Sequence, residues 1–221
     1  MCRRGVAGPV LAVLLRFVGP AYAGGAVAPS YFPLGVGNWW SYEEQDDDGK
    51  ALSRETWTLV PGEAHAGEFH LRALAKRLDA LGRGSRRWEG NEYLRRAADG
   101  LHTRYPAGHE AELDVQLLKE PASTGTRWQD AQGECVVTAL GVACVGPRGE
   151  LPDCLVVVCR QGRPASTTVT STYARDVGMV RQEVEVLQLL PQGSGPMVVR
   201  DDATKGHSLL RLIGYHVGPP R

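Results

Sequence analysis

The stretch ECVVTALGVACVGPRGELPDCLVVVC, residues 134–159, contains the two clearest strand signals in the chain. Residues 134–140 are rich in β-branched and apolar side chains. Residues 154–159 are continuously apolar, as in a strand that is buried on both faces. Between them, residues 146–149 combine two glycines with a proline, which predicts a turn. The stretch therefore predicts two β-strands joined by a tight connection.

The same pattern continues on both sides of this stretch. Trp40 and Tyr42 alternate with polar residues, and the Asp-Gly pairs at 48–49 and 99–100 are strong hairpin signals. The 27 glycines and 14 prolines are spread along the chain rather than gathered in one linker. Further strands are predicted at residues 40–43, 56–60, 91–96, 101–105, 113–118, 167–173, 180–190, 197–200 and 208–217. About a dozen short strands predict one all-β antiparallel domain over residues 31–221.

Residues 70–81 fit two structures. Leucines recur there at intervals of three and four residues among strong helix formers, which indicates a short helix. Phe69, Leu71 and Ala73 instead alternate with polar residues, which indicates a strand over the first half. The residue pattern alone leaves both alternatives open.

Two tryptophans occupy matching sequence contexts. Trp40 follows Gly37, and Trp128 follows Gly125, by three positions each, just before a predicted strand. The match is compatible with two halves of related design. Because a packed Trp buries a large apolar area, we expect both rings to be core anchors at the ends of the sheet.

The N-terminus has the pattern of a secretory signal peptide. Arg3 and Arg4 precede an apolar run over residues 6–15, and residues 21–23 supply a small-x-small cleavage site. The run is shorter than the ~20 apolar residues of a transmembrane helix. We expect a signal peptide over residues 1–23, a linker over 24–30, an extracytoplasmic (periplasmic or secreted) location and no membrane span after cleavage. The alternative is an N-terminal helix that the protein keeps.

Net charge excludes one class of partner. The full chain has 25 basic and 25 acidic residues, and cleavage after Ala23 removes three arginines and no acid. The mature protein then has 22 basic against 25 acidic residues, a formal charge of −3. Binding to nucleic acid through net positive charge is therefore not expected.

Four cysteines remain once cleavage removes Cys2: Cys135, Cys144, Cys154 and Cys159. An even number in an exported chain predicts disulfides. Cysteines 154 and 159 would lie ~16 Å apart along one extended strand, beyond the reach of a disulfide. A nested arrangement (144–154 and 135–159) and a crossed one (135–154 and 144–159) remain. The turn at 146–149 favours the nested one, and the lack of a Cys-x-x-Cys pair argues against zinc.

An acidic segment matches part of a calcium-loop template through Glu44, Asp46, Asp48, Gly49 and Glu55. Its first position is Glu rather than Asp, and its flanks are predicted strands rather than helices. We therefore expect an acidic hairpin tip, with weak calcium binding as the alternative.

Complete catalytic motifs are missing from the sequence. His109 and Glu110 begin a His-Glu-x-x-His zinc motif, but position 113 is Leu. Residues 193–195 read Gly-Ser-Gly without the rest of a nucleophile elbow. We therefore predict no catalytic residue, metal or cofactor.

Four short motifs resemble those of a family of exported bacterial β-rich domains of unassigned function. They are a Pro-Leu-x-x-Gly-x-x-Trp-x-Tyr-like start at residues 33–42, a second Gly-x-x-Trp at 125–128, a Gly-x-x-x-Cys-like entry into an apolar strand at 149–158, and Tyr-Ala-x-x-Val-Gly-x-Val at 173–180. In this sequence, the first and third segments are each one residue longer than the family's motif. The resemblance spans residues 31–217 and implies a curved antiparallel sheet or open barrel, akin to lipoprotein-carrier folds of the bacterial envelope. It favours a strand at residues 69–76 and supplies no catalytic residue.

These observations favour an exported, non-catalytic β-rich binding or scaffold module of the bacterial cell envelope. The partner would be an envelope protein. In the alternative, the protein binds a hydrophobic ligand, as lipoprotein carriers do; a secreted hydrolase is the third and least favoured. An inner face filled by its own side chains would favour the scaffold, whereas an uncovered apolar face would favour the carrier.

Export of the full chain to a bacterial periplasm is expected to yield a 198-residue protein that begins at Gly24 and contains two disulfides. Intact mass spectrometry before and after reduction and alkylation measures both properties. A protein that keeps residue 1, or one with four free thiols, would contradict the expectation.

Overall fold

The structure is a computed structural model that describes residues 30–61, 67–78, 84–105, 113–130, 133–161, 165–188 and 205–218. These ranges contain twelve β-strands and no helix. The strands are β1 Trp39–Gln45, β2 Ala51–Pro61, β3 Glu68–Leu78, β4 Gly84–Ala97, β5 Gly100–Tyr105, β6 Leu113–Lys119, β7 Arg127–Asp130, β8 Gly133–Gly146, β9 Gly149–Gln161, β10 Ala165–Ala174, β11 Gly178–Gln188 and β12 Lys205–His216. None of the described segments is a helix that could span a bilayer. The predicted signal peptide, the linker up to residue 29 and the strand predicted at 197–200 lie outside the described residues.

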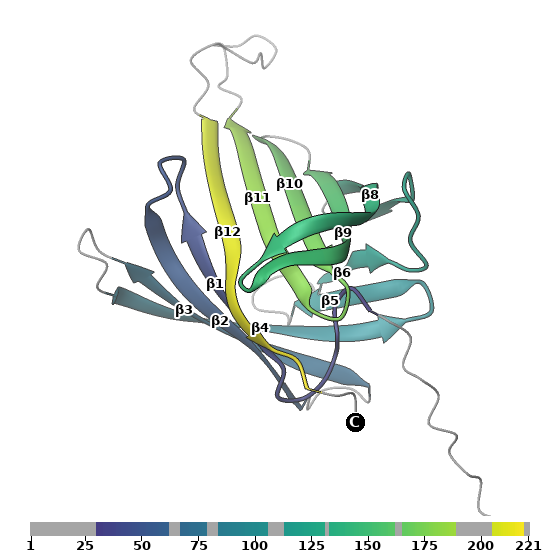
Figure 1. The fold of residues 1–221 in the computed structure, drawn as a ribbon, viewed down its shortest axis with the longest axis horizontal. Coiled ribbons are helices and arrows are strands. Elements are labelled where there is room, and N and C mark those ends of the chain that lie inside the picture. The colour runs from purple at the N-terminus through teal and green to yellow at the C-terminus, as the bar shows by residue number, and fades with distance from the viewer. Residues whose placement is uncertain are drawn as a thin grey trace, which may run out of the picture.

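All twelve described strands belong to one antiparallel sheet that curls into a nearly closed barrel (Figure 1). The order across the sheet is β6-β5-β4-β3-β2-β1-β12-β11-β10-β9-β8-β7. The sheet thus consists of two six-stranded meanders, β1–β6 and β7–β12. The pairing of β1 with β12, from Trp39 opposite His216 to Gln45 opposite Leu209, joins them. The predicted all-β antiparallel meander is confirmed.

The two meanders begin with the same turn. Gly37 and Gly125 have positive φ angles of 91° and 88°, a conformation that glycine adopts without steric cost. The Gly37 amide donates a 2.8 Å hydrogen bond to the Leu59 carbonyl oxygen of β2. The Gly125 amide donates a bond of the same length to the Val137 carbonyl oxygen of β8. Each bond thus reaches the second strand of its own meander. Trp40 and Trp128 follow, and both are buried. The two Gly-x-x-Trp segments are therefore core anchors, and they also start two halves of related design.

β6 and β7 lie at the two ends of the sheet and form the seam of the barrel. They are the counterparts of β12 and β1 at the other joint, but no ladder pairs them in the described part of the chain. The Trp128 indole spans the seam and donates a 2.8 Å hydrogen bond to the Gln116 carbonyl oxygen of β6. Both edge strands are short, with seven and four residues, which limits the unpaired backbone.

The helix alternative for residues 70–81 is wrong over its described part, which belongs to strand β3. β3 pairs with β4 along its whole length and with β2 from Phe69 to Arg77. Leu71 and Ala75 are buried inside the barrel, whereas Leu74 is 48% exposed on the outer face. The leucines at helical spacing therefore do not share one buried face. Two backbone ladders outweigh the small intrinsic helix preference of these residues.

The structure joins Cys135 to Cys159 and Cys144 to Cys154, which is the nested arrangement. Both disulfides connect β8 with β9, and the first joins residues that lie opposite each other in the ladder. The β8–β9 hairpin is therefore cross-linked at two points along its length.

The expectation that residues 154–159 are buried on both faces is wrong beyond the first two residues, Cys154 and Leu155, which are both buried. Val157 is buried inside the barrel, but Val156 and Val158 are only partly buried. These two valines lie on the outer face of β9, where no described element forms a second layer. A continuous apolar run does not by itself show that both faces of a strand are covered.

Aromatic side chains close the end of the barrel at which β1 begins. Trp40 is fully buried there, and its indole nitrogen donates a 2.5 Å hydrogen bond to the Val177 carbonyl oxygen. The Phe32 ring lies 4.9 Å from the Trp40 ring, between centroids. Tyr31 is also buried, and its hydroxyl donates a 2.7 Å hydrogen bond to Asp153. We call this packed end the base.

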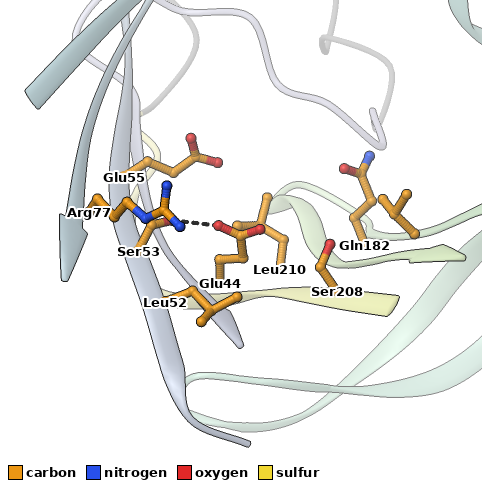
Figure 2. A pocket seen from close by; sticks show the side chains of 9 residues that line it. Glu44, Leu52, Ser53, Glu55, Arg77, Gln182, Ser208 and Leu210 are labelled. Carbon is orange, nitrogen blue, oxygen red and sulfur yellow. Dashed lines mark hydrogen bonds between the residues drawn. The ribbon is translucent and has the colours of Figure 1, made fainter. Parts of the chain in front are cut away.

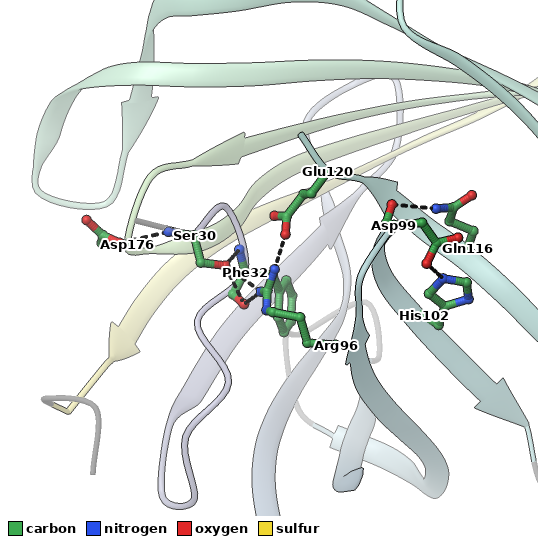
Figure 3. A network of polar contacts seen from close by, with 8 residues as sticks. All are labelled: Ser30, Phe32, Arg96, Asp99, His102, Gln116, Glu120 and Asp176. Atoms are coloured by element: carbon green, nitrogen blue, oxygen red, sulfur yellow. Dashed lines mark hydrogen bonds and ion pairs between the residues drawn. The ribbon is translucent and has the colours of Figure 1, made fainter. Parts of the chain in front are cut away.

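Polar contacts fix the segment that precedes β1 across this base. The Arg96 guanidinium of β4 donates to the Ser30 hydroxyl, to the Phe32 carbonyl oxygen and to the Glu120 carboxylate (Figure 3). The Ser30 amide donates to Asp176, between β10 and β11. Both meanders therefore hold the same segment.

Trp40→Phe is expected to lower the free energy of unfolding by about 2 kcal/mol, because it removes a buried hydrogen bond and part of a packed ring. Trp39→Phe is the matched control, since Trp39 is 37% exposed on the outer face; its expected change is below about 0.5 kcal/mol. Urea denaturation followed by circular dichroism measures both. Equal losses would show that Trp40 is not the anchor.

Candidate functional site

Inward-facing side chains fill the barrel over only part of its length. At the base, Leu59, Leu94 and Leu101 are fully buried. Toward the opposite end, which we call the mouth, packing leaves a cavity of about 640 Å³. It is lined by Glu44, Leu52, Ser53, Glu55, Arg77, Gln182, Val184, Ser208 and Leu210. Figure 2 shows these side chains converging from β1–β3 on one side and from β11 and β12 on the other.

A second, smaller cavity of about 260 Å³ lies between β5–β6 and β8–β10. Much of its lining is apolar, with Val115 and Val157 beside the Cys135–Cys159 disulfide. Gln182 borders both cavities. The interior therefore offers a compartment lined in part by Glu44, Glu55 and Arg77 at the mouth, next to one behind the seam whose lining contains no charged side chain among the described residues.

Several carboxylates on the outer face of the barrel have arginine partners. Glu43 pairs with Arg54 at 2.8 Å, and Glu68 pairs with Arg104 at 2.5 Å. Further ion pairs of this kind are Glu89–Arg72, Asp114–Arg95 and Glu134–Arg127. Most of the exposed pairs are worth little to stability individually, but they leave these acids with a compensating charge.

Carboxylates that face the interior have only neutral partners among the described residues. Ser53 donates a 2.8 Å hydrogen bond to Glu44, and Thr103 donates a 3.2 Å hydrogen bond to Glu92. Within the described ranges, no ion pair involves Glu44, Glu55 or Glu92. Several acids on the outer face are thus compensated by an arginine, whereas Glu44, Glu55 and Glu92 inside are not compensated by a described residue.

Burial shifts the titration of two of these interior acids. It raises the pKa of Glu55, a hydrogen bond with Trp57 opposes the shift, and the nearby charges of Glu44 and Glu92 add to it. Burial also raises the pKa of Glu92, and the hydrogen bond from Thr103 opposes that shift. Both shifts mean that the interior disfavours the charged form.

Three tyrosines surround these acids with neutral hydroxyl groups. Burial raises the pKa of Tyr173 and of Tyr105 to about 12, and the charge of Glu92 adds to the shift at Tyr105. Burial also raises the pKa of Tyr42 well above its usual value. The Tyr42 hydroxyl donates a 3.0 Å hydrogen bond to the Met179 carbonyl oxygen. The hydroxyl groups of these three tyrosines are therefore protonated at physiological pH.

The structure divides the candidate calcium loop between two places. Asp46 lies in the β1–β2 turn, where its carboxylate accepts hydrogen bonds from the amides of Asp48 and Lys50 at 3.1 and 2.9 Å. Glu44 and Glu55 instead line the larger cavity (Figure 2). No three or more His, Cys, Asp or Glu side chains gather as metal ligands within the described ranges. The five candidate residues do not form one site.

The other sequence candidates fall elsewhere. Residues 109–110 and 193–195 lie outside the described residues. The four cysteines are all in disulfides. No histidine of the described ranges lines either cavity.

Sequence reasoning named Glu44 and Glu55 only as candidate calcium ligands and missed most of the other residues that line the interior. Glu55 lies two positions from Trp57, and Glu92 lies two positions from Leu94, so alternation places each acid on the same face as a core residue. Gln182 has the same relation to Val180. A polar residue two positions from a core residue of the same strand was the sequence signal that could have indicated these interior positions.

No family model matches the chain, and no curated protein matches it. Two solved structures are similar to it. One is a candidate lipoprotein from Parabacteroides distasonis, with 13% identity, a TM-score of 0.46 and coverage of 85% of this chain and 99% of that one. The other is a candidate exported protein with a YmcC-like fold from Bacteroides fragilis, with 13% identity, a TM-score of 0.47 and coverage of 84% and 98%.

Glu55→Gln is expected to raise the free energy of unfolding at pH 7 by about 1 kcal/mol, because it removes a carboxylate that burial disfavours. The raised folded pKa means that the folded state binds more protons above the unfolded pKa. The Glu55 carboxyl therefore lowers the free energy of unfolding as pH rises through its folded pKa. The stability gained by Glu55→Gln should vanish at pH 4, where the carboxyl is largely protonated in both states. Urea denaturation between pH 4 and 8 measures it, with Glu185→Gln on an exposed position of β11 as control. A gain that is independent of pH would contradict this assignment.

Proposed function

We propose that this protein is an extracytoplasmic, non-catalytic binding module that holds a small amphipathic molecule inside its barrel. The observation that supports the proposal is the uneven filling of the interior. Its own side chains pack the base, whereas the mouth retains a cavity of about 640 Å³. That volume lies within the range of small-molecule sites in proteins.

The lining favours an amphipathic ligand over a purely hydrophobic one. Leu52, Val184 and Leu210 share the larger cavity with carboxylates, hydroxyls and an amide. A wholly apolar molecule would leave those polar groups without partners, which is unfavourable. The adjoining smaller cavity offers the apolar surface that such a ligand also needs.

Two further features support the extracytoplasmic part of the proposal. The N-terminal residues carry the pattern of a cleavable leader. The chain also has two disulfides, and disulfides persist mainly in oxidising compartments.

Binding of N-phenyl-1-naphthylamine, a neutral fluorophore that brightens in apolar surroundings, tests the proposal. We expect saturable binding at one site. Val184→Trp should weaken it at least 10-fold, because Val184 lines the larger cavity and a Trp would fill part of it. Glu185→Trp is the matched control, since the next residue of β11 is exposed on the outer face. Equal binding by both variants would exclude the interior and favour a scaffold that uses its outer surface.

A further inference from the structure

We infer that the larger cavity is a site for an organic cation, in which Glu44 and Glu55 bind the ammonium group of an amphipathic amine. The apolar part of that amine occupies the smaller cavity. This inference rests on the proposed function and specifies the chemical class of its ligand.

The two carboxylates are placed to act on one group. Glu44 lies on β1 opposite Ser53, and Glu55 lies on β2 opposite Tyr42. The two acids are therefore diagonal neighbours on one face of an antiparallel pair, within reach for long side chains. Both line the larger cavity (Figure 2).

The lack of a described cationic partner for Glu44 and Glu55 indicates that their ligand is positively charged. The chain supplies an arginine to acids such as Glu43, Glu68 and Glu89 on the outer face. It supplies none of the described cations to Glu44 or Glu55 inside. A carboxylate shielded from water lacks part of its solvation, and a charge-assisted hydrogen bond from an ammonium group restores it. The raised pKa of Glu55 reports the same deficit.

Arg77 is the cation of the larger cavity, and it does not cancel this preference. It lies near the end of β3 and is exposed, whereas Glu55 is partly buried. In the register of the sheet, Arg77 is opposite Ser53, and Glu55 lies two residues further toward the base. Glu44, which is also opposite Ser53, lies at the level of Arg77, and Glu55 lies deeper. The lining thus has two carboxylates and one guanidinium, which disfavours an anion inside.

The smaller cavity suits the apolar part of such a ligand. Val115, Leu117 and Val169 line it, together with Tyr105 and Tyr173. Neutral tyrosine rings can also contact a cation through their faces. Gln182 borders both cavities, so the two compartments adjoin at this residue.

Three eight-carbon probes of equal chain length test the charge preference: octylammonium, octanol and octanoate. Each displaces N-phenyl-1-naphthylamine from the full mature protein at pH 7.5, and calorimetry with octylammonium runs in parallel. We expect octylammonium to act at a concentration at least 10-fold lower than the other two, because hydrogen bonds to charged groups are the stronger class. Glu55→Gln should reduce the advantage over octanol to below 3-fold, and Glu44→Gln should reduce it as well. Glu185→Gln should leave it intact.

The possible results separate a failure of the cation site from a failure of ligand binding as a whole. Equal displacement by the three probes, or strongest displacement by octanoate, would overturn the cation site and leave the proposed ligand binding standing. No binding of N-phenyl-1-naphthylamine together with no heat from octylammonium would overturn both. An advantage of octylammonium that survives Glu55→Gln and Glu44→Gln alike, in proteins that unfold cooperatively, would assign the cation to other residues.

Discussion

The pairing of β1 with β12 is the contact on which the rest of the structure depends. It joins Trp39–Gln45 to residues near the other end of the chain, from Leu209 to His216. Without it, the two meanders would be separate sheets with an apolar face each. With it, both inner faces enclose one interior, and the Trp40 side chain at this joint reaches the Val177 carbonyl oxygen in the other meander.

The two joints of the barrel differ in strength, and the interior differs with them. β1 and β12 are joined by a backbone ladder, whereas the described contact between β6 and β7 includes the Trp128 indole hydrogen bond but no ladder. The smaller cavity lies behind this weaker joint, with Val115 and Gln116 of β6 on one side and Gly133 of β8 on the other. The two meanders begin with related turns at Gly37 and Gly125, but only one of the two joints between them is a backbone ladder in the described part of the chain.

Polar residues on the two faces of the sheet meet different electrostatic conditions. Outside, Glu43 forms a direct ion pair with Arg54, whose side chain is exposed to water. Inside, Glu55 has no ion-pair partner among the described residues, and burial together with the nearby charges of Glu44 and Glu92 opposes its ionisation. An antiparallel strand alternates its side chains between these two environments, so neighbouring acids such as Glu43 and Glu44 differ in partner while sharing a strand.

The sequence by itself determined the strands, their turns and the positions of the core anchors, because alternation, Asp-Gly pairs and Gly-x-x-Trp act over a few residues. It left residues 70–81 open, since local propensity and alternation disagreed there until β2 and β4 supplied ladders on both sides. It also grouped Glu44 and Glu55 with Asp46 by spacing, although strand pairing turns the two glutamates into the barrel. Only the tertiary structure decided where the sheet closes, which end is packed and which acids lack a counter-charge. These properties depend on contacts between residues far apart in the chain, and local sequence patterns carry no information about such contacts.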